Sequence, residues 1–151
     1  MITRKGEPII MRVIAALLAG ALTLTAADID SATFIDHDKM AAAFAKGGRL
    51  IAGSEFQVSG SHRDAPGGAE VHEKGTDILY LVEGEATLVT GGTMVNAKPT
   101  APGEIRGTEI RDGREQHLVK GDLIMIPAGV PHWFKEVTRS TSYLTVKVLK
   151  P

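Results

Sequence analysis

The chain has 151 residues, a length that suits one compact domain and is too short for two independent hydrophobic cores. Its formal net charge of -1 excludes the broad basic surface on which nucleic-acid binding depends. The absence of cysteine excludes disulfide bonds and thiolate chemistry, and it argues against a lipid anchor on a lipobox cysteine.

The N-terminal segment has the pattern of an export signal. Arg12 gives it a positive start, and residues 13–24 form an apolar stretch too short to span a membrane comfortably, followed by small residues. We therefore expect residues 1–27 to be a signal peptide, with Met11 as a candidate true start and a periplasmic or secreted product without a membrane segment. The alternative is an amphipathic or core helix, but the run lacks a polar face and Asp28 follows it at once.

Residues 28–48 are expected to form an N-terminal arm and one short helix. Asp36 or Asp38 can cap this helix, because an aspartate side chain accepts hydrogen bonds from the free N–H groups of the first turn. Helix-favouring residues continue to Phe44, and Gly47 ends the pattern. We expect no other substantial helix.

Residues 49–151 have the pattern of a β-barrel domain. Seventeen glycines and seven prolines lie between short β-branched runs, which favours an all-β architecture over a helical bundle. Strands are expected at residues 50–52, 55–63, 69–72, 78–82, 86–90, 104–110, 116–119, 123–126, 132–137 and 142–149. Glycine turns such as Glu83-Gly84 predict antiparallel hairpins, and the Gly- and Pro-rich segment 91–107 is interpreted as a loop near one end of the barrel.

Residues 70–77, with the sequence Glu-Val-His-Glu-Lys-Gly-Thr-Asp, bring together side chains that bind metals. Glu70 and His72 are two residues apart on an expected strand, so they point to the same face. Gly75 permits a turn that returns Asp77 beside them. The same parity carries Leu79 inward, where it would form an apolar floor under the polar ligands.

A second segment, residues 121–134, delivers a further histidine. Its sequence is Gly-Asp-Leu-Ile-Met-Ile-Pro-Ala-Gly-Val-Pro-His-Trp-Phe, and the alternating prolines restrict the backbone of the turn before His132. Strand parity predicts Phe134 and Glu136 on the face of His132, and Trp133 on the opposite face.

Together the two segments predict a site for one divalent metal ion, with Glu70, His72, Asp77 and His132 as ligands. Two neutral imidazoles and one or two carboxylates suit iron(II), manganese, nickel or zinc and leave positions open for a substrate. Taken alone, the first segment also fits exposed polar residues at strand ends. The second segment favours the metal site.

The two segments resemble the motifs of the cupin superfamily, in particular the small single-domain cupins of the cupin 2 type. The first motif's second histidine, acid and closing glycine are matched by His72, Asp77 and Gly84. The second motif's glycine, proline, glycine and histidine are matched at the expected spacing by Gly121, Pro127, Gly129 and His132. The resemblance covers about residues 50–149 and implies an antiparallel jelly-roll barrel with the metal inside. It also implies a homodimer, in which residues 28–35 would add a strand to the neighbouring subunit.

The sequence departs from the family's motifs at four positions. Glu70 stands where the first histidine is usual, and Asp77 stands in place of a glutamate. Asp64 replaces the leading glycine of the first motif and Glu136 the final asparagine of the second. Because an aspartate reaches less far, either Glu70 compensates as a ligand or Asp77 binds through a different geometry.

The first functional hypothesis is an exported metal-dependent enzyme for a small polar substrate, such as a carbohydrate-like molecule or an organic acid. The cupin resemblance leaves the oxygenase, isomerase and lyase classes open. Glu136 or His62 would act as acid or base, and Tyr80 could donate a proton. The alternatives are a core or rim position for His62 and a core or dimer-interface position for Tyr80. The pair Arg63-Asp64 and the stretch from Arg106 to Arg111 are candidate contacts for an anionic substrate, or solvated charges beside turns.

Two other classes of function are open. The first is a noncatalytic cupin that binds or senses a small ligand such as a sugar. The second is a barrel without a metal that serves only for association.

Overall fold

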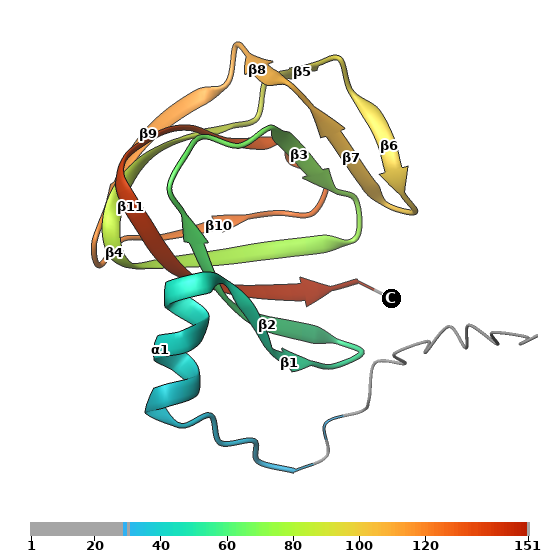
Figure 1. The fold of residues 1–151 in the computed structure, drawn as a ribbon. Helices are drawn as coiled ribbons and strands as arrows, with labels where there is room; N and C mark the ends of the chain where they lie inside the picture. The colour runs from blue at the N-terminus through green and yellow to red at the C-terminus, as the bar shows by residue number, and fades with distance from the viewer. Residues whose placement is uncertain (1–28, 30, 151) are drawn as a thin grey trace, which may run out of the picture.

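The computed structural model describes residue 29 and residues 31–150, in which one helix precedes eleven strands (Figure 1). In chain order these elements are α1 (His37–Lys46), β1 (Gly48–Ala52), β2 (Phe56–Arg63), β3 (Ala69–His72), β4 (Gly75–Thr90), β5 (Thr93–Val95), β6 (Lys98–Ala101), β7 (Glu104–Gly107), β8 (Glu109–Arg111), β9 (Arg114–Val119), β10 (Leu123–Ile126) and β11 (His132–Leu149). The expected signal peptide, residues 1–27, lies outside the described residues. Within the described part, no helix is long and apolar enough to cross a membrane.

Helix α1 begins and ends where the sequence predicts. The Asp36 side chain caps it by accepting a 2.9 Å hydrogen bond from the backbone of Lys39. At the other end, Gly47 adopts a φ of 74° and its N–H donates to the carbonyl of Ala43. The helix packs on β1 and β2 (Figure 1), and Ala43 is buried against Gly60, where an added Cβ would lie 2.6 Å from the alanine side chain.

The strands form an antiparallel jelly roll in which β4 and β11 each take part in two layers. In one layer, the N-terminal half of β4, before Gly84, pairs with the C-terminal half of β11, after residue 141. This pair is flanked by β10 on one side and by β2 and β1 on the other. The remaining halves also pair and are flanked by β9 on one side and by β3, β7 and β6 on the other. The two layers enclose the core, so the predicted all-β barrel is confirmed.

The predicted hairpin at Glu83-Gly84 is wrong, because the chain bends there instead of reversing. Gly84 has a φ of 81°, and a Cβ at this position would lie 2.2 Å from the carbonyl oxygen of Ser140 on β11. The β11 strand shifts register between Val137 and Ser142, on the other side of the same corner. Both long strands therefore pass from one layer to the other, where two shorter strands were expected for each.

The segment 91–107, expected to be a loop, contains the short strands β5 and β6, and the strand expected at 104–110 is divided into β7 and β8. The β7 strand pairs with β3 so that Arg106 lies opposite Glu70 and Glu104 lies opposite His72. These pairings hold two polar side chains against the predicted ligands. The loop assignment failed because strands of three or four residues give too short an alternating pattern to detect.

The core between the layers lies directly under the predicted site. Its buried members are Leu79, Leu81, Ala86, Leu88, Leu118, Ile126, Phe134 and Tyr143. Full burial of such a large apolar side chain contributes about 1.5–3 kcal/mol. Leu79 points inward as the strand parity of Asp77 predicts, and Tyr80 points to the opposite, outer face with 42% of its surface exposed.

Candidate metal centre

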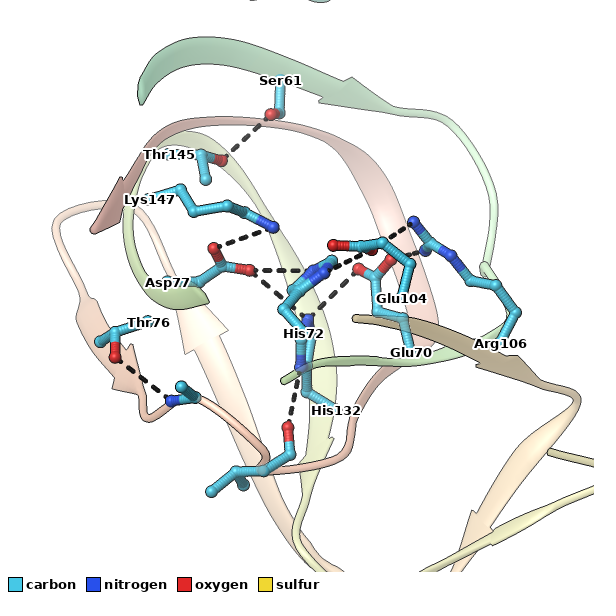
Figure 2. A network of polar contacts seen from close by, with 12 residues as sticks. Ser61, Glu70, His72, Thr76, Asp77, Glu104, Arg106, His132, Thr145 and Lys147 are labelled. Carbon is cyan, nitrogen blue, oxygen red and sulfur yellow. Dashed lines mark hydrogen bonds and ion pairs between the residues drawn. The ribbon is translucent and has the colours of Figure 1, made fainter. Parts of the chain in front are cut away.

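Four polar side chains from three strands converge between the layers (Figure 2). Glu70 and His72 extend from β3, Asp77 from β4 and His132 from the start of β11. The last three are almost fully buried, with 6%, 4% and 3% of their surfaces exposed. The structure thus brings together all four residues that the sequence singles out as metal ligands.

The turn before His132 is attached directly to β3. Gly129 adopts a φ of 83°, and its N–H donates a 2.8 Å hydrogen bond to the carbonyl oxygen of His72. His132 then lies opposite Glu70 in the ladder between β11 and β3. The positive φ explains why glycine stands at position 129 of the second motif, and its hydrogen bond ties the turn before His132 to the strand that carries His72.

Hydrogen bonds fix the orientation of both imidazole rings. Nδ1 of His72 lies 2.7 Å from a carboxylate oxygen of Glu104, and Nδ1 of His132 lies 3.2 Å from the carbonyl oxygen of Val130. Because these oxygens only accept hydrogen bonds, each Nδ1 carries the proton. Both Nε2 atoms are then free to offer a lone pair to a metal.

The Nε2 atoms face carboxylate oxygens at distances that fit a shared cation. Nε2 of His72 lies 3.3 Å from Oδ2 of Asp77, and Nε2 of His132 lies 3.3 Å from Oε1 of Glu70 and 3.7 Å from Asp77. The two imidazole nitrogens and the two carboxylates thus face one another. Such a donor set suits a divalent ion, which would offset their mutual repulsion.

Glu70, His72 and His132 form a set whose ligand atoms all lie within 4.8 Å of one another. Asp77 borders this set, and its second oxygen, Oδ1, is buried without a hydrogen-bond partner, 3.4 Å from the ammonium of Lys147. Burial alone would raise the pKa of Asp77, but the contact with His72 and the charge of Lys147 outweigh it and lower the pKa. Asp77 is therefore ionised at neutral pH.

His132 is held in its neutral, metal-binding form. Burial lowers its pKa to about 4, against the opposing influence of the Val130 carbonyl and the charge of Asp77. At pH 7 no proton competes for its Nε2 atom.

Residues that the motif pattern does not mark support the ligands. Arg106 forms an ion pair with one oxygen of Glu70 and lies 3.7 Å from Glu104, so Oε1 of Glu70 stays turned toward His132 (Figure 2). The sequence did not predict a role for Glu104, because its contact with His72 depends on the register between β3 and β7. Lys147 had a detectable signal, since it follows Tyr143 and Thr145 at every second position of an expected strand.

The residues predicted to act as acid or base lie elsewhere. Glu136 is exposed and accepts a hydrogen bond from Thr87, because a bulge after Phe134 reverses the strand parity that was expected to turn it inward. His62 faces away from the ligands, between Ser142 and Asp64. The inward positions of β2 belong to its neighbours Ser61 and Arg63.

The site opens into a cavity of about 260 Å³. Its walls combine the four ligands with hydroxyl, aromatic and basic groups: Ser61, Arg63, Glu70, His72, Asp77, Leu79, His132, Phe134, Tyr143, Thr145 and Lys147. The cavity can admit a small molecule to the open side of the ligand set.

Residues 54–148 match the sequence model of the family named Cupin. The chain belongs to the cupin family. This assignment agrees with the jelly roll and confirms the family to which the two motifs pointed.

Two solved structures illustrate the fold that this cupin shares. A Bacillus halodurans protein, BH2720, is 16% identical with a TM-score of 0.58, over 82% of this chain and 86% of its own. Protein NMB1881 of Neisseria meningitidis is 15% identical with a TM-score of 0.52, over 77% of this chain and 99% of its own. At such identity the likeness shows the fold alone. No curated protein sequence matches the chain.

Proposed function

We propose that this cupin is a metal-dependent enzyme that acts on a small polar molecule. The supporting observation is the pair of buried imidazoles, each with Nδ1 engaged by an acceptor and Nε2 turned toward Glu70 or Asp77 at 3.3 Å. A purely structural cluster would have no need to expose both lone pairs to two carboxylates.

Glu70, His72 and His132 would hold the ion, with Asp77 as a fourth ligand. Two histidines and a carboxylate with open positions form a set used by non-haem iron enzymes, and it also accepts manganese, nickel or zinc. When bound, the metal supplies a Lewis acid or a redox centre for the substrate at its open positions.

Lys147 is the proton carrier that the site offers. Its Nζ lies 3.4 Å from Asp77, its side chain is 20% exposed, and it lines the cavity. An ammonium at this place can donate a proton to a substrate oxygen or stabilise negative charge on it. It takes the part that Glu136, His62 and Tyr80 were expected to play, since those three lie outside the cavity lining.

Metal loading followed by a turnover screen tests the proposed activity. The protein would be stripped, reloaded with iron(II) under oxygen, manganese, nickel or zinc, and offered organic acids and sugars. We expect turnover with at least one metal, and its loss in Lys147→Met at unchanged metal content. Binding without conversion in every loaded form would contradict the enzyme and favour the noncatalytic sensor.

We also propose that the protein is a homodimer. On the outer face, Tyr80 lies opposite Leu123 and Ile78 opposite Met125 in the β4–β10 ladder, and Leu123 and Met125 are 63% and 58% exposed. A second copy would cover this apolar surface. Sedimentation should show a dimer that Leu123→Glu dissociates, and a monomeric wild type would contradict the proposal.

Export to the periplasm is proposed from the sequence of residues 1–27 alone. Expression of the full chain in a bacterial host, followed by fractionation and mass determination, should find a periplasmic product cut after Ala27. A cytoplasmic product of full mass would contradict this.

A further inference from the structure

Arg63 is a half-buried cation in the wall of the metal cavity, and among the described residues it has no carboxylate partner. The other arginine beside the site, Arg106, is paired with Glu70 and Glu104. A guanidinium keeps its charge at every relevant pH, so one that is partly removed from water favours an anion beside it.

The guanidinium of Arg63 is held in a fixed orientation. Its Nε donates a 3.0 Å hydrogen bond to the hydroxyl of Tyr143, and its central carbon lies 4.7 Å from the ring centroid of Phe134. The two aromatic rings stack on each other at 5.2 Å. Gly67 leaves room on one side, since a Cβ there would lie 2.6 Å from a terminal nitrogen of Arg63.

With a divalent metal bound, the lining of the cavity would carry an excess of positive charge. Glu70 and Asp77 are balanced by Arg63 and Lys147, so a divalent ion would bring the lining to two net positive charges. An anion in the cavity would relieve this excess.

We propose that Arg63 binds the carboxylate of a small organic acid whose other polar end reaches the metal, an inference that rests on the proposed metal site. With Nε occupied by Tyr143, the two terminal nitrogens form a planar fork that matches a carboxylate. Phe134 and Tyr143 provide an apolar wall for the body of the acid.

Calorimetric titration of the zinc-loaded protein tests this subsite without requiring turnover. The probes are benzoate and propionate, each compared with its uncharged amide, and inorganic phosphate. The variants are Arg63→Gln and Arg63→Lys. Arg111→Gln is the matched control, because Arg111 is exposed and, within the part of the chain that the structure describes, forms its ion pair with Glu109 alone. Zinc content is measured for each protein by mass spectrometry.

We expect at least one acid to bind about tenfold or more tightly than its amide, a preference that Arg63→Gln abolishes. Arg63→Lys should retain part of it, since the charge remains and the fork is lost. Arg111→Gln should bind as the wild type does, and all variants should contain the same amount of zinc.

Three results would overturn the assignment. In the first, the acids bind no better than their amides. In the second, Arg63→Gln binds the acid as tightly as the wild type, because the anion sits on the zinc. In the third, the protein prefers phosphate over both acids and this preference depends on Arg63. A wild type without zinc would instead contradict the metal site, and the same titrations on the zinc-free protein would then test Arg63 by itself.

Discussion

Glu104 accepts a 2.7 Å hydrogen bond from Nδ1 of His72, across the pairing of β7 with β3. This contact turns Nε2 of His72 toward Asp77. It also makes the ring a better metal ligand, because the hydrogen-bonded carboxylate raises the basicity of the imidazole. The short strand β7 therefore belongs to the metal centre, although it contributes no ligand.

Removing this support should weaken metal binding. Glu104→Ala is expected to lower the zinc affinity about 10- to 100-fold, since the His72 ring loses its fixed tautomer and orientation. Competition with a chromogenic chelator measures the change. Glu109→Ala is the control, because the ion pair that the described residues give Glu109 is with the exposed Arg111, away from the ligands. Equal affinities for the two variants would contradict the role of Glu104.

The carboxylate of Glu70 replaces a histidine of the usual motif and should act as a true ligand. Glu70→Gln keeps the size of the side chain and removes its charge, and we expect it to lose metal affinity about tenfold or more. Glu70→His restores the usual ligand and should retain more affinity than the glutamine variant. Metal binding by Glu70→Gln at wild-type strength would show that the ligand set does not include this residue.

The metal-free protein should lose stability in mild acid because of His132. Its folded pKa is about 4 against an ordinary value of 6.5, so between these values the unfolded chain takes up a proton that the folded chain refuses. The free energy of unfolding should therefore fall as the pH drops from 6.5 to 4, by about 3 kcal/mol from this group.

Urea unfolding at several pH values, with chelator present, measures this loss. Asp77 does not mask it, because a lowered carboxylate pKa costs stability only as the pH falls below the ordinary value of 3.8. In His132→Gln the slope between pH 6.5 and 4 should flatten. An unchanged slope in this variant would mean that other groups cause the acid sensitivity.

The corner at Gly84 should tolerate no side chain. Gly84→Ala combines a φ of 81° with a Cβ 2.2 Å from the Ser140 carbonyl. Gly91→Ala is the matched control, with a φ of 70° and no atom within 4 Å of the new Cβ. Both variants bear the left-handed backbone cost of about 1 kcal/mol, and Gly84→Ala should lose about 1–3 kcal/mol more from the clash. Equal thermal stabilities would contradict a packed corner.

The sequence predicted the barrel and the ligand cluster because both depend on local signals. Two-residue parity placed Glu70 with His72, and the Pro-Gly turn placed His132. Parity failed where the strand bends: the bulge after Phe134 turned Glu136 outward, and Gly84 extended a strand that was expected to end. Glu104 could not be assigned a role from sequence, because its contact with His72 depends on register between strands 32 residues apart.

Metal stoichiometry tests the central claim most directly. Protein purified without an affinity tag or added chelator, and then titrated with zinc, should bind one ion per chain by mass spectrometry and calorimetry. His72→Ala and His132→Ala should each abolish this binding, while His117→Ala, which alters an exposed histidine on β9, should leave it intact. A wild type that binds no ion, or a His132→Ala variant that binds one as tightly, would contradict the account.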